Sequence, residues 1–129
     1  MGDRGNIEIR QGYQAADGSR DEASVFLYTH WRGSEVPAIL ADALVKAGGR
    51  AGDQAYLTRI VFDQMVDADS GIMGFGIALG YPPDNEHPIP QVRWNSGRRD
   101  RLRIAYLDRD YTIDEFVLEY ATKEEDPLD

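Results

Sequence analysis

The order of strand-like and helix-like patterns along the chain is the feature that most constrains its fold. Two strand patterns come first, followed by two helix patterns, three more strand patterns and a final helix pattern. Segments grouped in this way favour an antiparallel sheet, whereas strict alternation of strands and helices would favour a parallel one. We therefore predict an α+β fold in the order β-β-α-α-β-β-β-α, with a largely antiparallel sheet and the helices packed on one face.

The first two strand patterns are placed to form a hairpin. Residues Ile7–Arg10 alternate apolar and polar side chains, and Val25–Trp31 are rich in β-branched and aromatic residues. Ala16–Ser19, between them, are turn-forming residues. Both faces of the second pattern carry bulky side chains, which is typical of a strand that is central in its sheet or covered on both sides.

Two amphipathic helices are expected next. Ser34 is a good N-cap for the first, whose apolar side chains follow helical spacing over Val36–Ala47, and Gly48–Gly49 end it. Asp53 is placed to cap the second helix, over Gln54–Val66.

The strand pattern over Ile72–Leu79 divides its side chains unevenly. Large apolar residues fall on one face and only glycine and alanine on the other; they are Met73, Phe75, Ile77 and Leu79 against Gly74, Gly76 and Ala78. A bare face indicates that another backbone comes close, because glycine otherwise weakens a strand. We expect a packed helix against this face, with a bound ligand as the alternative.

The last strands are predicted over Pro90–Asn95 and Arg101–Leu107. Thr112 and Glu115 have capping-box spacing at the start of the final helix. One α+β domain is therefore expected over residues 1–122, followed by an acidic, frayed tail over residues 123–129.

Composition excludes several classes of protein. The chain has 129 residues, the usual size of one domain, and no cysteine, which excludes disulfide scaffolds, thiolate zinc sites and cysteine nucleophiles. It has no signal-peptide pattern and no apolar run of the ~20 residues that a membrane-spanning helix needs. We expect a cytoplasmic protein with no membrane partner.

The net charge of −9 bears on possible partners. An acidic chain repels nucleic acid, so duplex nucleic acid is a disfavoured partner, whereas a basic protein surface would be attracted. Residues 91–109 are the exception, because they contain six arginines and two aspartates and so have a local net charge of +4.

These arginines define the first candidate site. If the two strands of residues 90–107 pair, Arg93, Arg101 and Arg103 share one surface beside Arg99. Guanidinium groups bind phosphate or carboxylate in a bidentate manner, so a small anionic ligand such as a nucleotide is one hypothesis, with Trp94 or Tyr106 as a stacking surface. The alternative is that carboxylates such as Glu8 or Asp108, or solvent, compensate the charge.

The loop Asp84–His87 is a weaker candidate. Asp84, Glu86 and His87 are residue types that bind divalent cations or transfer protons, but their spacing matches no known metal loop. His30 and His87 are the only two histidines, so a three-histidine zinc site is impossible. A structural hydrogen bond is the favoured role for each, and no metal site is predicted.

Several stretches carry a family resemblance: Val25–Leu40, Ala55–Val66, Gly74–Leu79 and Asp84–Ile89. With a YTHW-x-G strand end at residues 28–33 and a DNE-x-P loop at residues 84–88, they resemble a set of small uncharacterised proteins from bacteria and their phages. The resemblance covers residues 3–95. It implies a small regulatory or counter-defence protein and assigns no catalytic residue.

Three hypotheses for function follow. The leading one is a non-enzymatic binding or interaction protein, because nucleophile elbows and phosphate loops are both missing from the sequence. The second is a binder of a small anionic ligand at the arginines. The third is a small hydrolase or transferase that uses His30 and the Asp84–His87 loop. No cofactor and no catalytic residue are assigned, and the strand pattern is compatible with a homodimer.

Overall fold

The computed structural model describes residues 2–14, 16–66, 72–94 and 101–122. Within these residues the strands are β1 (Gly5–Gln14), β2 (Arg20–Thr29), β3 (Phe75–Leu79), β4 (Gln91–Trp94), β5 (Leu102–Tyr106) and β6 (Arg109–Tyr111). The helices are α1 (Val36–Ala47), α2 (Gln54–Met65) and α3 (Ile113–Tyr120). The predicted α+β class is confirmed. The predicted tail over residues 123–129 lies outside the described residues.

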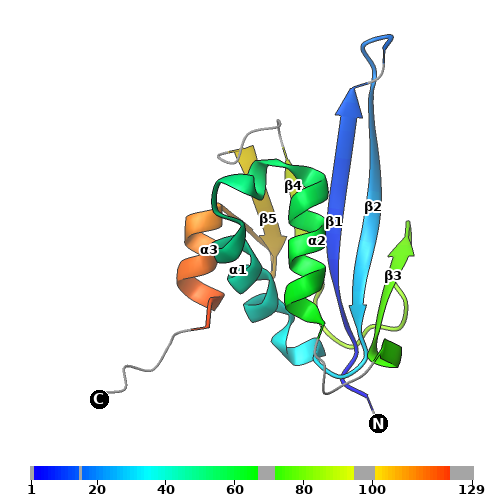
Figure 1. Ribbon diagram of the computed structural model, residues 1–129, viewed down its shortest axis with the longest axis vertical. Helices are drawn as coiled ribbons and strands as arrows, with labels where there is room; N and C mark the ends of the chain where they lie inside the picture. Colours follow the sequence, from blue (N-terminus) through cyan, green and yellow to red (C-terminus); the bar gives the residue numbers. More distant parts are fainter. Residues whose placement is uncertain (1, 15, 67–71, 95–100, 123–129) are drawn as a thin grey trace.

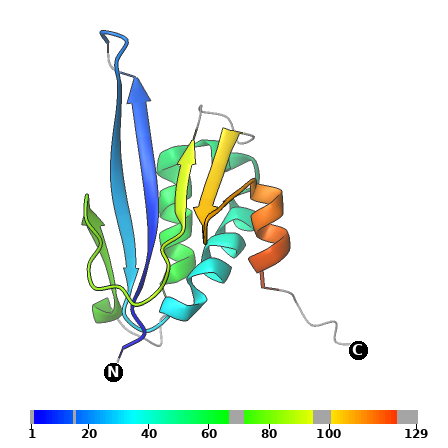
Figure 2. The ribbon, with the colours of Figure 1, turned by 180° about the vertical axis from the view of Figure 1, so that it is seen from behind.

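The described strands form one sheet in the order β3-β2-β1-β4-β5-β6. β1 and β4 are parallel, and the other neighbouring strands are antiparallel, as the sequence predicted for most of the sheet. All three helices lie in front of the sheet in Figure 1 and behind it in Figure 2. We call the side that the helices cover the helix face and the opposite side the open face.

The core lies between the helix face and the helices. Alternate strand residues supply one half and the apolar stripes of the helices supply the other; among them are Ile7, Ile9, Leu27, Val92 and Ile104, packed with Leu40, Leu44, Leu57 and Val61. Burial of each such aliphatic side chain contributes roughly 1.5–3 kcal/mol. Among the described helices none is long and apolar enough to cross a membrane.

Two of the predicted helix caps form. The Asp53 carboxylate accepts a hydrogen bond from the Tyr56 amide at 3.2 Å, and the capping box of Thr112 and Glu115 closes in both directions. The cap predicted for α1 is wrong. Residues 33–35 form a short 3-10 turn, and the Ser34 hydroxyl donates to Asp3 at 2.6 Å instead of capping the helix.

A strand that the sequence analysis missed lies before α3. Leu107 and Asp108 form a tight turn with φ of 50° and 63°, and the chain returns as β6 alongside β5. Turns that need positive φ at two residues usually carry asparagine or glycine. The Leu-Asp pair gave no such signal, so the predicted order lacked one strand.

The expected helix against the glycine face of β3 is not there. Gly76 and Ala78 lie on the open face, whereas α1–α3 pack on the helix face. A side chain added at Gly76 would meet only the Tyr28 ring, at 3.8 Å. The loop that follows β3 crosses the open face instead (Figure 2).

A substitution of Trp94 tests the packing on the helix face. Trp94 is 6% exposed, and its Nε1 donates to the Ala51 carbonyl at 2.8 Å. Trp94→Phe leaves that buried carbonyl without its donor and creates a small cavity, so we expect the free energy of unfolding to fall by about 2 kcal/mol. Urea unfolding followed by circular dichroism measures it. Trp31→Phe is the control, because Trp31 is 48% exposed; an equal loss in both variants would contradict the packing described.

Candidate functional site

The predicted arginine cluster forms, but its charge is compensated within the protein. Arg93 and Arg103 face each other across β4 and β5 on the open face. Between them lies Asp110 of β6, whose carboxylate is 3.4 Å from the Arg93 guanidinium and 3.1 Å from that of Arg103. The compensating carboxylate is therefore Asp110, not Glu8 or Asp108. Arg101, the residue before β5, is exposed, and Arg99 lies outside the described residues.

The aromatic residue proposed to stack beside these arginines faces the other way. Trp94 alternates with Arg93 along β4, so its ring is buried on the helix face. No stacking surface for a base is therefore formed next to Arg93 by Trp94.

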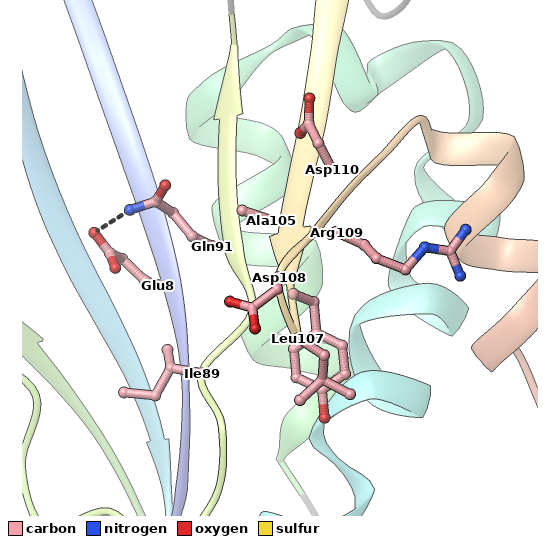
Figure 3. A pocket seen from close by; sticks show the side chains of 9 residues that line it. Glu8, Ile89, Gln91, Ala105, Leu107, Asp108, Arg109 and Asp110 are labelled. Carbon is pink, nitrogen blue, oxygen red and sulfur yellow. Dashed lines mark hydrogen bonds between the residues drawn. The ribbon is translucent and has the colours of Figure 1, made fainter.

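A groove of about 480 Å³ lies beside the arginine cluster on the open face. Three carboxylates line it, those of Glu8, Asp108 and Asp110. Figure 3 shows Asp108 pointing toward Gln91 and Ile89, while Arg109 extends away toward α3, where it pairs with Glu119 at 3.4 Å. The groove is acidic, which disfavours an anionic ligand there.

The loop that contains Asp84, Glu86 and His87 holds the start of β1. The Glu86 amide donates to the Arg4 carbonyl at 2.9 Å, and the Glu86 carboxylate accepts from the Arg4 amide at 3.1 Å. The Asp84 carboxylate lies 3.7 Å from the Arg4 guanidinium. Asn6, fully buried beneath the loop, donates to Asn85 at 3.1 Å. These contacts fix the loop in its position across the open face.

The two histidines have separate structural partners. The Nδ1 atom of His30 hydrogen-bonds to the Tyr28 hydroxyl at 2.8 Å, and its ring meets Trp31 edge to face. The His87 ring pairs instead with the Asp3 carboxylate. Among the described residues no group of three histidine, aspartate or glutamate side chains is placed to hold a metal ion.

Asp3 has an unusually low pKa as a result of this packing. Hydrogen bonds from the Ser34 hydroxyl, the Ser34 amide and His87 lower the pKa of Asp3 from 3.8 to about 2. Asp3 therefore joins three separate segments: the start of the chain, the turn before α1 and the Asp84–His87 loop.

The outer edge of β3, in contrast, has no such partner among the described residues. Hydrogen bonds from the His30 amide to the Gly74 carbonyl and from the Gly80 amide to the Ser24 carbonyl, both 2.8 Å, fix which β3 residues bond to β2. In the observed register these are the even-numbered residues. The amides and carbonyls of Phe75, Ile77 and Leu79 consequently point away from the sheet, and no hydrogen bond with another described residue occupies them.

The same three residues carry large apolar side chains on the helix face. Ile77 is 60% exposed and Leu79 82% exposed, because α2 covers β1 and not β3, while Phe75 is half-buried. Exposed Met73 and Tyr81 flank the strand. We call the outward backbone groups and side chains of Phe75, Ile77 and Leu79 the β3 edge.

The other described strand segments that lack a neighbouring strand are protected. Where β1 extends past β4, the Gln54 side chain donates to the Gly12 carbonyl at 3.1 Å and accepts from its amide at 2.8 Å, in place of a neighbouring strand. Where β2 extends past β3, it presents Asp21 and Glu22. β6 has three residues, two of them charged. Charge, short length and side-chain caps are the usual protections of a strand edge.

The β3 edge has none of these protections. Residues 72–83 contain no aspartate, glutamate, lysine, arginine or histidine. An exposed, uncharged, apolar strand edge is a surface on which another strand can pair.

Comparison with known proteins gives no family assignment. Neither the scan against family models nor the searches of curated proteins and solved structures found a match.

The Asp3 cluster predicts a specific response to acid. Because the folded-state pKa of Asp3 lies below its unfolded value of 3.8, its stabilisation is complete above about pH 4 and is lost as the pH falls toward 2. Asp3→Asn should remove this dependence. We expect the wild type to lose about 1 kcal/mol more than the variant between pH 5 and pH 2, a figure reduced for the partial exposure of Asp3. Urea unfolding at several pH values measures this difference in the free energy of unfolding. Identical pH profiles of the wild type and the variant would show that the Asp3 carboxylate does not stabilise the contact between these segments.

Proposed function

We propose that this chain is a non-enzymatic interaction protein that binds another polypeptide by strand addition at the β3 edge. One observation carries the proposal: the outward backbone groups of Phe75, Ile77 and Leu79 bond to no other described residue, and the apolar side chains of Ile77 and Leu79 on the same strand are exposed. In strand addition the main-chain hydrogen bonds supply affinity, and the alternate side chains supply specificity.

The framework around the β3 edge suits this role. β2 holds β3 along its whole length, from Val25 opposite Leu79 to Thr29 opposite Phe75, so the edge is presented on a rigid strand. An ordered edge loses little conformational entropy when a partner binds, which favours association. Binding of this kind is also consistent with the small regulatory or counter-defence protein that the resemblance to bacterial and phage proteins implies.

The two alternative functions have less support. For an anionic ligand, Arg93 and Arg103 would first have to release Asp110. For a hydrolase or transferase, His30 and His87 would have to leave Tyr28 and Asp3. Each change would break an existing contact before any chemistry began.

Photo-crosslinking at single positions tests the proposal. We would replace Leu79 with the photoreactive residue benzoylphenylalanine and irradiate cells that express the protein. Leu118, on the exposed side of α3 and 78% exposed, is the matched control. We expect a crosslink to a polypeptide from position 79 at a yield at least several-fold above that from position 118. Mass spectrometry identifies the crosslinked chain.

Either identity of that chain, another protein or a second copy, would support strand addition at the β3 edge. Equal crosslinking from both positions, or none from position 79, would contradict it.

A further inference from the structure

We propose that the polypeptide bound at the β3 edge is a second copy of this chain, paired antiparallel with Ile77 opposite Ile77 of the other copy. The inference rests on the proposed function and names its partner. It assigns the exposed edge to a symmetric dimer whose two sheets join into one.

The register follows from the free groups. The outward residues are Phe75, Ile77 and Leu79, spaced evenly about Ile77. A two-fold axis through the Ile77 pair places Phe75 of each copy opposite Leu79 of the other. Each opposed pair can then exchange both of its N–H···O=C hydrogen bonds, which is the requirement of an antiparallel ladder. A symmetric interface must be complementary to itself in this way.

The side chains fit the same arrangement. A two-fold axis perpendicular to the sheet keeps the helix faces of both copies on one side. The apolar side chains of Ile77 and Leu79, now exposed, then lie beside those of the other copy, where cross-strand neighbours pack. Pairing in this register would remove from water the two most exposed apolar side chains of β3.

The lack of charge at this edge removes the local attraction for a basic partner and permits a second copy. The chain carries −9, so two copies repel each other over most of their surfaces. Residues 72–83 carry no charged side chain, so this edge is a place where two acidic copies can meet without opposing charges. A basic partner would find no carboxylate within these residues to bind.

The repulsion between acidic copies also determines the effect of salt on dimerisation. Salt screens the repulsion between copies and leaves apolar contact intact, so dimerisation should strengthen between 50 and 500 mM NaCl. Binding to a basic partner would weaken over the same range.

Paired charge variants at the two-fold axis test the register. In Ile77→Lys or in Ile77→Glu, like charges oppose each other across the axis, and we expect each variant alone to dimerise at least 10-fold more weakly than the wild type. A mixture of the two opposes lysine to glutamate, and we expect it to form a heterodimer. Sedimentation equilibrium measures the masses, and circular dichroism checks that each variant is folded. Leu118→Lys and Leu118→Glu, on α3, are the controls and should dimerise as the wild type does.

Each outcome decides the inference. A dimer of wild type, monomers of both single variants and a heterodimer in the mixture support it. A wild type that stays monomeric at several hundred micromolar in 500 mM NaCl overturns it without any variant having to fold. Single variants that still dimerise, or a mixture that does not, overturn the register. A monomeric wild type that still crosslinks from position 79 to another protein would leave the proposed function standing, so the two proposals fail separately.

Discussion

The apolar layer between three helices and one face of the sheet is the interaction on which the other features depend. Its centre is β1, whose Ile7 and Ile9 are fully buried between β2 and β4. The layer decides which surfaces remain. It assigns Arg93 and Arg103 to the open face and Trp94 to the core, and it leaves β3 beyond the reach of α2. The candidate site is thus a consequence of where the helix layer stops.

Other described edges of the sheet carry a local protection that β3 lacks. The amide of Gln54 takes the place of a strand beside Gly12, and charged residues lie along the free part of β2 and on β6. On the open face, the Asp84–His87 loop is held by Arg4 and Asp3, and the opposed arginines share Asp110. Arg93, Arg103 and the two histidines are therefore bonded within the protein, whereas the outward backbone groups of β3 bond to no other described residue. Hydrogen-bonding capacity in a buried or half-buried setting is rarely left unused.

The sequence predicted the fold class and most elements because their signals are local: helical periodicity, turn residues and two side-chain caps. It missed β6 because the Leu107–Asp108 turn has neither asparagine nor glycine. It assigned Ser34 to a cap because the contact that Ser34 makes instead, with Asp3, joins residues far apart in the chain. For the arginines it predicted the facing pair but not the partner, since Asp110 lies on the missed strand. The division of Ile72–Leu79 into a face of large side chains and a bare face was visible in the sequence. Periodicity does not distinguish a buried apolar face from an exposed one. The prediction therefore concerned the glycine face, and the exposure of Ile77 and Leu79 was not predicted.

Residue-resolved amide hydrogen exchange along β3 shows directly whether copies pair at the β3 edge, because adjacent amides in this strand point in opposite directions. The Ala78 amide faces β2 and serves as the internal reference, while the Ile77 amide faces outward. In dilute solution we predict slow exchange at Ala78 and fast exchange at Ile77. At concentrations where copies associate, we predict that Ile77 becomes protected at least 10-fold while Ala78 changes little. Fast exchange at Ile77 in a sample shown to be associated would contradict the account, since the copies would then be joined through a surface other than the β3 edge.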